Sequence, residues 1–170
     1  MSESARRHKL HAAGRAAGCA VLTISDSRTE ETDTGGKKIL EGLEAHGHRR
    51  VAYGIVPDDP ERIEERLVAW IGEPEIQVVL TTGGTGISRR DTTIEVVERL
   101  LDKPLSGFGE LFRMLSWQEI GSPAMLSRAV AGLAQGTFLF SMPGSPNAVA
   151  LAMERLILPE LPHLLWERSR

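Results

Sequence analysis

Residues 80–91 are Leu80-Thr81-Thr82-Gly83-Gly84-Thr85-Gly86-Ile87-Ser88-Arg89-Arg90-Asp91, and they continue the apolar run at 76–80. That run is short, rich in β-branched residues and flanked by turn residues, which is typical of a buried parallel strand. Three glycines and three threonines therefore stand at the carboxyl end of a predicted strand. In an open α/β sheet, ligands bind at that end.

The residue types of this loop favour an anion as its ligand. Glycines allow backbone N–H groups to approach an anion closely, and threonine hydroxyls can donate further hydrogen bonds. Arg89 and Arg90 add positive charge, and Asp91 places an acid beside them. The alternative is a strand-to-helix turn in which the glycines serve only the geometry and Asp91 is the N-cap. The nucleotide-binding P-loop and the dinucleotide fingerprint are excluded, because neither glycine pattern occurs here.

Composition indicates one soluble globular domain. The chain has 170 residues, of which 41% are hydrophobic and 25% charged, enough for a single core. No apolar run has the length of a membrane span. Cys19 is the single cysteine and the five histidines have no zinc-type spacing, so we expect a reducing, cytoplasmic location without a structural zinc.

Charge is divided unequally along the chain. Residues 1–17 carry a net charge of +3, which leaves −6 for the remainder of a total of −3. An acidic globular part argues against a nucleic-acid partner. The leader has no apolar core of a secretory signal, so we predict a flexible basic arm at 1–17 and a domain at 18–168.

Strands and helices alternate along most of the chain. Turn residues and hydrophobic spacing predict strands at 19–24, 51–56, 76–80 and 137–142. They predict helices at 34–45, 60–71, 92–101, 109–115, 122–133 and 148–158, with a short last helix to Trp166. This alternation predicts an α/β fold, a single domain with a mostly parallel central sheet flanked by helices.

All four predicted strands end in polar, turn-forming segments at 25–29, 57–59, 82–91 and 143–147. In a parallel sheet these ends share one edge, so they predict a binding cleft. The second end leaves an alternative open. If Pro60 is the first helical residue, Asp59 is the N-cap and Asp58 is free; otherwise Asp58 is the cap and Glu61 completes a capping box.

Six motifs in this order resemble the molybdenum-cofactor-biosynthesis proteins of the MoaB/Mog type, which also occur as a domain of gephyrin. The motifs are Ser25-Asp26-Ser27-Arg28 with Asp33-Thr34-Gly35-Gly36, Pro57-Asp58, the loop 81–86 followed by Asp91, Gly107-Phe108-Gly109-Glu110, Leu126-Ser127-Arg128 and Pro143-Gly144-Ser145-Pro146. The resemblance spans about residues 18–165, and the set is specific although no single motif is.

This resemblance implies a molybdopterin-binding-like fold that assembles as a trimer or a dimer of trimers. It implies binding of molybdopterin, a pterin with a dithiolene and a terminal phosphate, and adenylylation of that phosphate by Mg-ATP with release of pyrophosphate. Asp58 and Asp91 would be catalytic and hold Mg²⁺. Contacts to cofactor and substrate would come from Ser25, Asp26, Ser27, Thr82, Gly83, Gly84, Thr85, Gly86, Glu110, Ser127, Arg128, Pro143, Gly144, Ser145 and Pro146.

Two rival hypotheses remain at this stage. A non-catalytic molybdopterin carrier or scaffold would need the anion-binding loop but gain nothing from two converging carboxylates. A relationship to the competence-damage-type proteins would point to nucleotides, although those chains usually carry additional domains. Glu110 has a structural alternative too, as an ion-pair partner of Arg113 within one helix.

Overall fold

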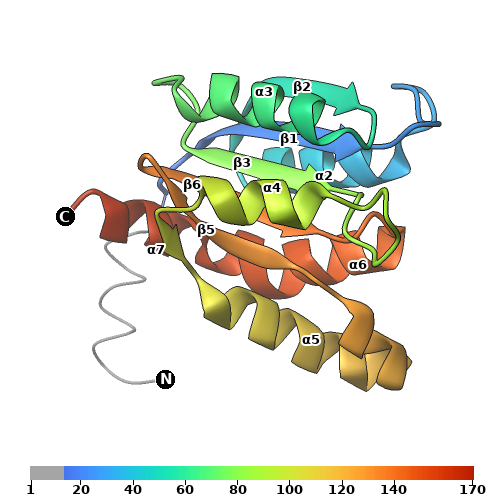
Figure 1. The fold of residues 1–170 in the computed structure, drawn as a ribbon. Helices are drawn as coiled ribbons and strands as arrows, with labels where there is room; N and C mark the ends of the chain where they lie inside the picture. The colour runs from blue at the N-terminus through green and yellow to red at the C-terminus, as the bar shows by residue number, and fades with distance from the viewer. Residues whose placement is uncertain (1–13) are drawn as a thin grey trace.

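Four neighbouring parallel strands, from the edge strand β2 to β6, make up most of a six-stranded sheet with the order β2-β1-β3-β6-β5-β4 (Figure 1). The computed structural model describes residues 14–170. β5 and β4 extend the sheet antiparallel at one side. The strands are β1 (Gly18–Ile24), β2 (Arg49–Val56), β3 (Val78–Thr82), β4 (Lys103–Pro104), β5 (Val130–Ala134) and β6 (Thr137–Met142). The predicted α/β class with a mostly parallel sheet is confirmed.

Helices cover both faces of this sheet, each with its own apolar cluster (Figure 1). On β1, Ala20 and Leu22 face α3 and α4, while Cys19 and Val21 face the other helices. This alternation is what period-two side-chain geometry requires of a strand buried on both faces. The helices are α2 (Thr34–Ala45), α3 (Pro60–Ile71), α4 (Thr93–Leu100), α5 (Ser106–Ile120), α6 (Pro146–Ala152) and α7 (Leu158–Arg168).

The strand order creates a topological switch point beside β1. β1 pairs in parallel with β2 on one side and with β3 on the other, so the chain reverses its direction of winding between them. The connections that leave β1 and β3 consequently run to opposite faces of the sheet. Helix α2 packs on the face that carries Val21, and α4 packs on the face that carries Leu22. A crevice at the carboxyl ends of such strands is the usual ligand site of open α/β sheets.

The predicted helix at 122–133 is wrong. Ser122–Leu126 is a short 3-10 helix, η1, and Val130–Ala134 is the antiparallel strand β5. Small residues suit a helix by propensity, yet here they allow close strand packing. A Cβ on Gly132 would lie 2.6 Å from the Lys103 carbonyl oxygen of β4, so glycine at this position permits the β4–β5 pairing.

The C-terminal helices are longer and more continuous than predicted. α6 passes through a π-helical turn, η2 (Met153–Ile157), directly into α7. Pro159 stands in the first turn of α7, where its missing N–H costs little. In the part of the chain that the structure describes, no helix has the length and apolarity needed to cross a bilayer.

Most of the predicted N-terminal arm, residues 1–13, lies outside the described residues. Its predicted end is nevertheless anchored, because the Ala17 N–H donates to His48 Nδ1 at 3.2 Å and the Arg49 N–H donates to the Ala17 carbonyl at 2.8 Å. Ala17 is buried. Ala17, one residue before β1, is therefore packed against the domain.

Candidate functional site

The carboxyl ends of the four parallel strands meet at one edge of the sheet and are tied together by backbone hydrogen bonds. The Ser25 N–H after β1 donates to the Val56 carbonyl of β2 at 2.9 Å. The Gly83 N–H after β3 donates to the Met142 carbonyl of β6 at 3.2 Å. Polar segments that lie far apart in the sequence thus share one surface.

The loop after β3 requires glycine at two positions, Gly83 and Gly84. Gly83 and Gly84 have φ angles of +101° and +61°, in the region that glycine adopts readily. A Cβ on Gly83 would lie 2.2 Å from the Ile24 carbonyl oxygen, and one on Gly84 would lie 2.1 Å from Thr93 Oγ1. The N–H groups of Gly84 and Thr85 make no backbone hydrogen bond within residues 14–170, which leaves them for an anion.

Asp58 and Asp91 flank this loop. Asp58 Oδ2 lies 3.0 Å from the position that a Cβ on Gly84 would occupy, and Asp91 Oδ2 lies 2.5 Å from the corresponding position on Gly86. The two carboxylates also interact electrostatically, since the negative charge of Asp91 contributes to the raised pKa of Asp58. The loop and the two acids therefore form one continuous polar site.

Asp58 does not cap a helix. The neighbouring Asp59 is the N-cap of α3 and accepts from the Arg62 N–H at 3.0 Å, with Pro60 in the first turn. This resolves the alternative left open by the sequence. Asp58 Oδ1 accepts one long hydrogen bond, 3.4 Å, from the Thr92 N–H. Partial burial raises the pKa of Asp58, and the charges of Asp91 and Asp26 raise it further.

Asp91 is not the N-cap of the following helix. α4 begins at Thr93 with Thr92 as its N-cap, and no side chain caps it. Asp91 Oδ2 instead accepts from the Ser88 N–H at 2.9 Å, and this hydrogen bonding lowers the pKa of Asp91. The surroundings therefore shift the pKa values of the two carboxyl groups in opposite directions, up for Asp58 and down for Asp91.

Two arginines hold the loop in place. Arg90 forms an ion pair with Asp26 at 2.5 Å, and Asp26 Oδ1 also accepts from the Asp58 N–H at 3.2 Å. Arg128 donates to the carbonyls of Thr85, Gly86 and Asp91 and pairs with Glu95. Arg128 thus makes four hydrogen bonds for its five N–H groups. It therefore serves mainly to fix the loop, with little capacity left to bind a phosphate, and Asp26 likewise bridges two parts of the site.

Three other predicted contact residues also have partners within the protein. The Thr82 hydroxyl donates to the Pro143 carbonyl at 3.2 Å, and Ser145 Oγ caps α6 by accepting from the Ala148 N–H. Ser25 Oγ accepts from the N–H groups of Ser27 and Arg28. The hydroxyls of Thr82, Ser145 and Ser25 therefore shape the edge of the sheet through contacts within the protein.

The turn after β6 closes the same edge. A Cβ on Gly144 would lie 3.2 Å from the Gly83 Cα, so this turn packs directly against the glycine loop. Pro143, Ser145 and Pro146 stand on either side of that contact, and Gly144, Ser145 and Pro146 are exposed. The structure thus brings the 143–146 motif to the predicted cleft.

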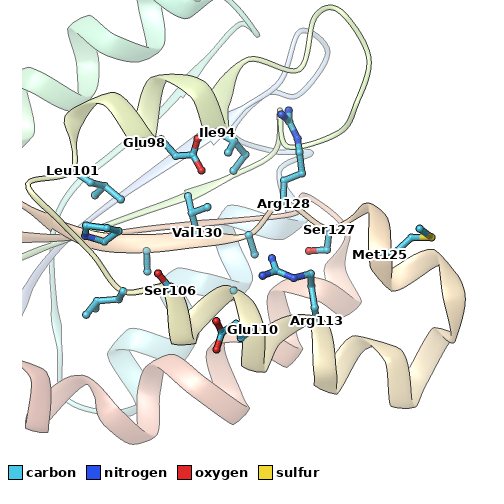
Figure 2. Close-up of a pocket in the computed structure, with 15 residues that line it drawn as sticks. Ile94, Glu98, Leu101, Ser106, Glu110, Arg113, Met125, Ser127, Arg128 and Val130 are labelled. Carbon is cyan, nitrogen blue, oxygen red and sulfur yellow. The ribbon is translucent and has the colours of Figure 1, made fainter.

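The remaining predicted residues, Glu110, Ser127 and Arg128, lie in a separate pocket of about 550 Å³ between α4, α5 and β5 (Figure 2). Arg128 belongs to both regions, since it lines this pocket and holds the glycine loop. The Ser127 hydroxyl is buried without a hydrogen-bond partner among the described residues. The predicted set therefore divides into an edge site and a pocket joined by Arg128.

Sequence reasoning missed two polar residues near these two regions. Thr93 is fully buried and its hydroxyl, which has no partner among residues 14–170, points at Gly84. Glu95 is the ion-pair partner of Arg128. Thr93 and Glu95 lie within four residues of Asp91, and this closeness in the sequence could have indicated that they belong near the site.

A doubly wound sheet with a glycine loop and two carboxylates at its switch point defines an α/β protein built to bind an anionic, phosphate-bearing ligand. Residues 20–163 match the family model described as "Probable molybdopterin binding domain". The chain therefore belongs to this molybdopterin-binding-domain family of molybdenum cofactor biosynthesis proteins, as the motifs predicted.

Individual relatives agree with this assignment. The chain is 54% identical over 153 residues to "Molybdenum cofactor biosynthesis protein B" of Bacillus cereus, covering 89% of this chain and 90% of the relative. A crystal structure of a molybdenum cofactor biosynthesis protein B is 53% identical with a TM-score of 0.90, covering 93% and 99% of the two chains. The tungsten cofactor synthesizing protein MoaB from Pyrococcus furiosus is 40% identical with a TM-score of 0.83, covering 93% and 100%.

Proposed function

We propose that the protein acts in molybdenum cofactor biosynthesis by binding molybdopterin and adenylylating its terminal phosphate with Mg-ATP. An oxygen of the pterin phosphate would attack the α-phosphorus of ATP, and the bond to the β-phosphate oxygen would break. The products are adenylylated molybdopterin and pyrophosphate. One phosphorus–oxygen bond forms and one breaks at the α-phosphorus, so the reaction balances. Such a transfer needs alignment and charge neutralisation more than covalent help from the protein.

The observation that carries this proposal is the placement of Asp58 and Asp91 on the two sides of the glycine loop. Anion binding alone gains nothing from two carboxylates at the anion's position, because like charges repel. Their presence makes sense when a divalent cation accompanies the phosphates. The free N–H groups of Gly84 and Thr85 supply the anion-binding part of the same site.

The donor set fits Mg²⁺ better than a metal held by protein alone. Within residues 14–170, no group of three or more His, Cys, Asp or Glu side chains is arranged to hold a metal. Mg²⁺ is ordinarily bound by one or two carboxylates together with substrate phosphates and water. Asp58 and Asp91 would hold it, and when bound it would neutralise charge on the reacting phosphates.

The proposal is tested with Asp91→Asn. This change removes a charge but keeps the shape and the acceptor for the Ser88 N–H, so molybdopterin binding should stay within about threefold of wild type. Adenylylation should fall by at least about 10³-fold, which is typical for loss of a group that neutralises transition-state charge. Near-normal turnover in this variant would refute the assigned role of Asp91.

A carrier or scaffold in the same pathway is the second candidate function. The observation that favours it is the occupation of Arg128, Thr82, Ser145 and Asp26 by internal partners, which leaves few side chains free for chemistry. Saturable molybdopterin binding with no pyrophosphate formed from ATP and Mg²⁺ would select this function. Pyrophosphate formed in proportion to adenylylated pterin would exclude it.

We also propose that the protein is a homo-oligomer, either a trimer or a dimer of trimers. Large apolar side chains are exposed along α5 and into η1, namely Leu111, Met114, Trp117, Ile120, Met125 and Leu126. Exposed apolar side chains gathered in this way are typical of protein interfaces. Phe108 and Phe112 of the same helix are instead buried in the core, where Phe108 packs against Phe112 and Phe140.

A further inference from the structure

Thr93 is the first residue of α4, and its hydroxyl is buried beside the glycine loop without a hydrogen-bond partner. The residue is 0% exposed, and Oγ1 has neither donor nor acceptor among residues 14–170. A threonine inside a helix can donate to a carbonyl of the preceding turn, but at the first helical position that turn does not exist. Because burying an unpaired polar group costs free energy, this hydroxyl needs a physical explanation.

The Thr93 hydroxyl and the Asp58 carboxylate both lie next to Gly84. A Cβ on Gly84 would lie 2.1 Å from Thr93 Oγ1 and 3.0 Å from Asp58 Oδ2. The two oxygens are therefore separated by no more than the sum of these distances, 5.1 Å, although no hydrogen bond joins them. A side chain at residue 84 would crowd both oxygens, and glycine avoids this.

Of these two groups, Thr93 is held in place and Asp58 is less constrained. The Thr93 N–H donates to the Gly84 carbonyl at 3.1 Å, and its side chain is fully buried. Asp58 lies in the short connection between β2 and α3 and is half-buried. Its Oδ1 accepts only the long hydrogen bond of 3.4 Å from the Thr92 N–H, and its Oδ2 accepts none from the described part of the chain. A fixed donor thus lies close to a carboxylate oxygen that has room to accept.

We propose that Thr93 is a positioning residue for Asp58, an inference that rests on the proposed function. When a divalent cation and phosphates bind at the edge site, the Asp58 side chain rotates and Oδ2 accepts a hydrogen bond from the Thr93 hydroxyl. This bond fixes the orientation of the carboxylate and leaves its other lone pairs for the cation. Removing such a partner of a metal-binding carboxylate typically lowers metal affinity about 10–100-fold. The hydroxyl that is unpaired in the free protein thereby gains its partner in the bound one.

The test compares two substitutions of Thr93 in the full-length protein. Thr93→Val keeps the shape and removes the hydroxyl, whereas Thr93→Ser keeps the hydroxyl and removes the methyl group. Affinity for Mn²⁺, a paramagnetic substitute for Mg²⁺, is measured from the electron paramagnetic resonance signal of free Mn²⁺ in the presence of α,β-methylene-ATP, which resists cleavage at the α-phosphorus. Thr93→Val should weaken Mn²⁺ binding about tenfold or more, and Thr93→Ser should stay within about threefold of wild type.

Melting temperatures without ligands separate positioning from a purely structural role. Removing an unpaired buried hydroxyl leaves no other group unsatisfied, so Thr93→Val should melt at or above the wild-type temperature. The matched control is Thr137→Val at the opposite end of the sheet, where a buried hydroxyl donates to the Ile71 carbonyl at 3.1 Å. Thr137→Val should melt about 2–4 °C lower and bind Mn²⁺ like wild type.

The outcomes also separate this inference from the proposed function. Mn²⁺ binding by Thr93→Val that equals wild type refutes the positioning role and leaves the adenylylation proposal standing. Equal weakening in Thr93→Val and Thr93→Ser assigns the effect to packing and refutes it too. Adding Thr93→Val to Asp58→Ala should cause no further loss, because the hydroxyl acts through Asp58, and a further loss would contradict that route. Wild-type protein that binds no Mn²⁺ with the nucleotide refutes both proposals.

Discussion

At the scale of single residues, the two carboxylates beside the glycine loop differ in how the fold treats their charge. Burial raises the pKa of Asp58, and the charges of Asp91 and Asp26 add to that shift. Hydrogen bonding to Ser88 lowers the pKa of Asp91. At neutral pH the charge on Asp58 therefore opposes folding, whereas the charge on Asp91 favours it.

We therefore predict effects of opposite sign on stability. At pH 7.5, Asp58→Asn should raise the melting temperature and Asp91→Asn should lower it, each by about 1–3 °C for a chain of this size. Both differences should shrink toward zero as the pH falls to about 3.9 and below, where a free aspartate is protonated. Thermal denaturation of the three proteins across that pH range checks this, and equal signs for the two variants would contradict it.

At the scale of elements, the contact between α5 and β5 depends on one glycine of the Gly-Phe-Gly-Glu motif. A Cβ on Gly109 would lie 2.5 Å from the Ala129 carbonyl oxygen, while one on Gly107 would have no neighbour within 4 Å. We predict that Gly109→Ala lowers the free energy of unfolding by about 1–3 kcal/mol through overpacking. The matched change Gly107→Ala should leave it equal or raise it by up to about 1 kcal/mol, from helix propensity.

Urea denaturation of these two variants gives the comparison directly. Equal stability of Gly109→Ala and Gly107→Ala would mean that α5 moves away from β5 at little cost.

The glycine loop is an element held from one side by Arg128. Lysine carries one ammonium and cannot reproduce a guanidinium that serves Thr85, Gly86 and Glu95 together. We predict that Arg128→Lys accelerates amide hydrogen exchange in residues 84–91 about tenfold or more. Arg99→Lys is the control, because Arg99 makes a single surface ion pair with Glu64. Unchanged exchange in the Arg128 variant would show that the loop is held without it.

The elements were predictable from the sequence to different degrees. Strong hydrophobic runs and turn residues located the four parallel strands and α2, α3 and α4 within a few residues. β5 was mistaken for helix because Ala129, Ala131 and Gly132 are small and the segment lacks β-branched residues except Val130. Its identity depends on pairing with β6 and β4, which are contacts that local propensity does not contain.

At the scale of the whole molecule, the exposed apolar side chains of α5 should govern assembly. Trp117 is 60% exposed and lies on α5 together with other exposed apolar residues. Val68 is comparably exposed, at 51%, but lies on a different helix, α3. We predict that light scattering gives a mass of three or six times the 18.6 kDa chain and that Trp117→Glu reduces it. Val68→Glu should leave the mass unchanged. A monomeric wild-type protein would contradict the proposed oligomer.

The site was predictable as a set of motifs but not as two regions. Parallel strands bring their carboxyl ends to one edge, so the convergence of residues 25–29, 57–59, 82–91 and 143–147 followed from the strand pattern alone. The separation of Glu110, Ser127 and Arg128 into a second pocket depends on β5, which the sequence did not predict. The use of Arg128 and Asp26 as internal anchors depends on side-chain geometry that only the folded chain shows.

The most direct test of the central claim is to incubate the wild-type protein with molybdopterin, ATP and Mg²⁺ and to quantify adenylylated pterin and pyrophosphate. We predict that the two products form in equal amounts and that neither forms when Mg²⁺ is chelated. Molybdopterin that binds saturably but yields neither product would contradict adenylylation by Asp58, Asp91 and the glycine loop, and would assign the protein to the carrier function.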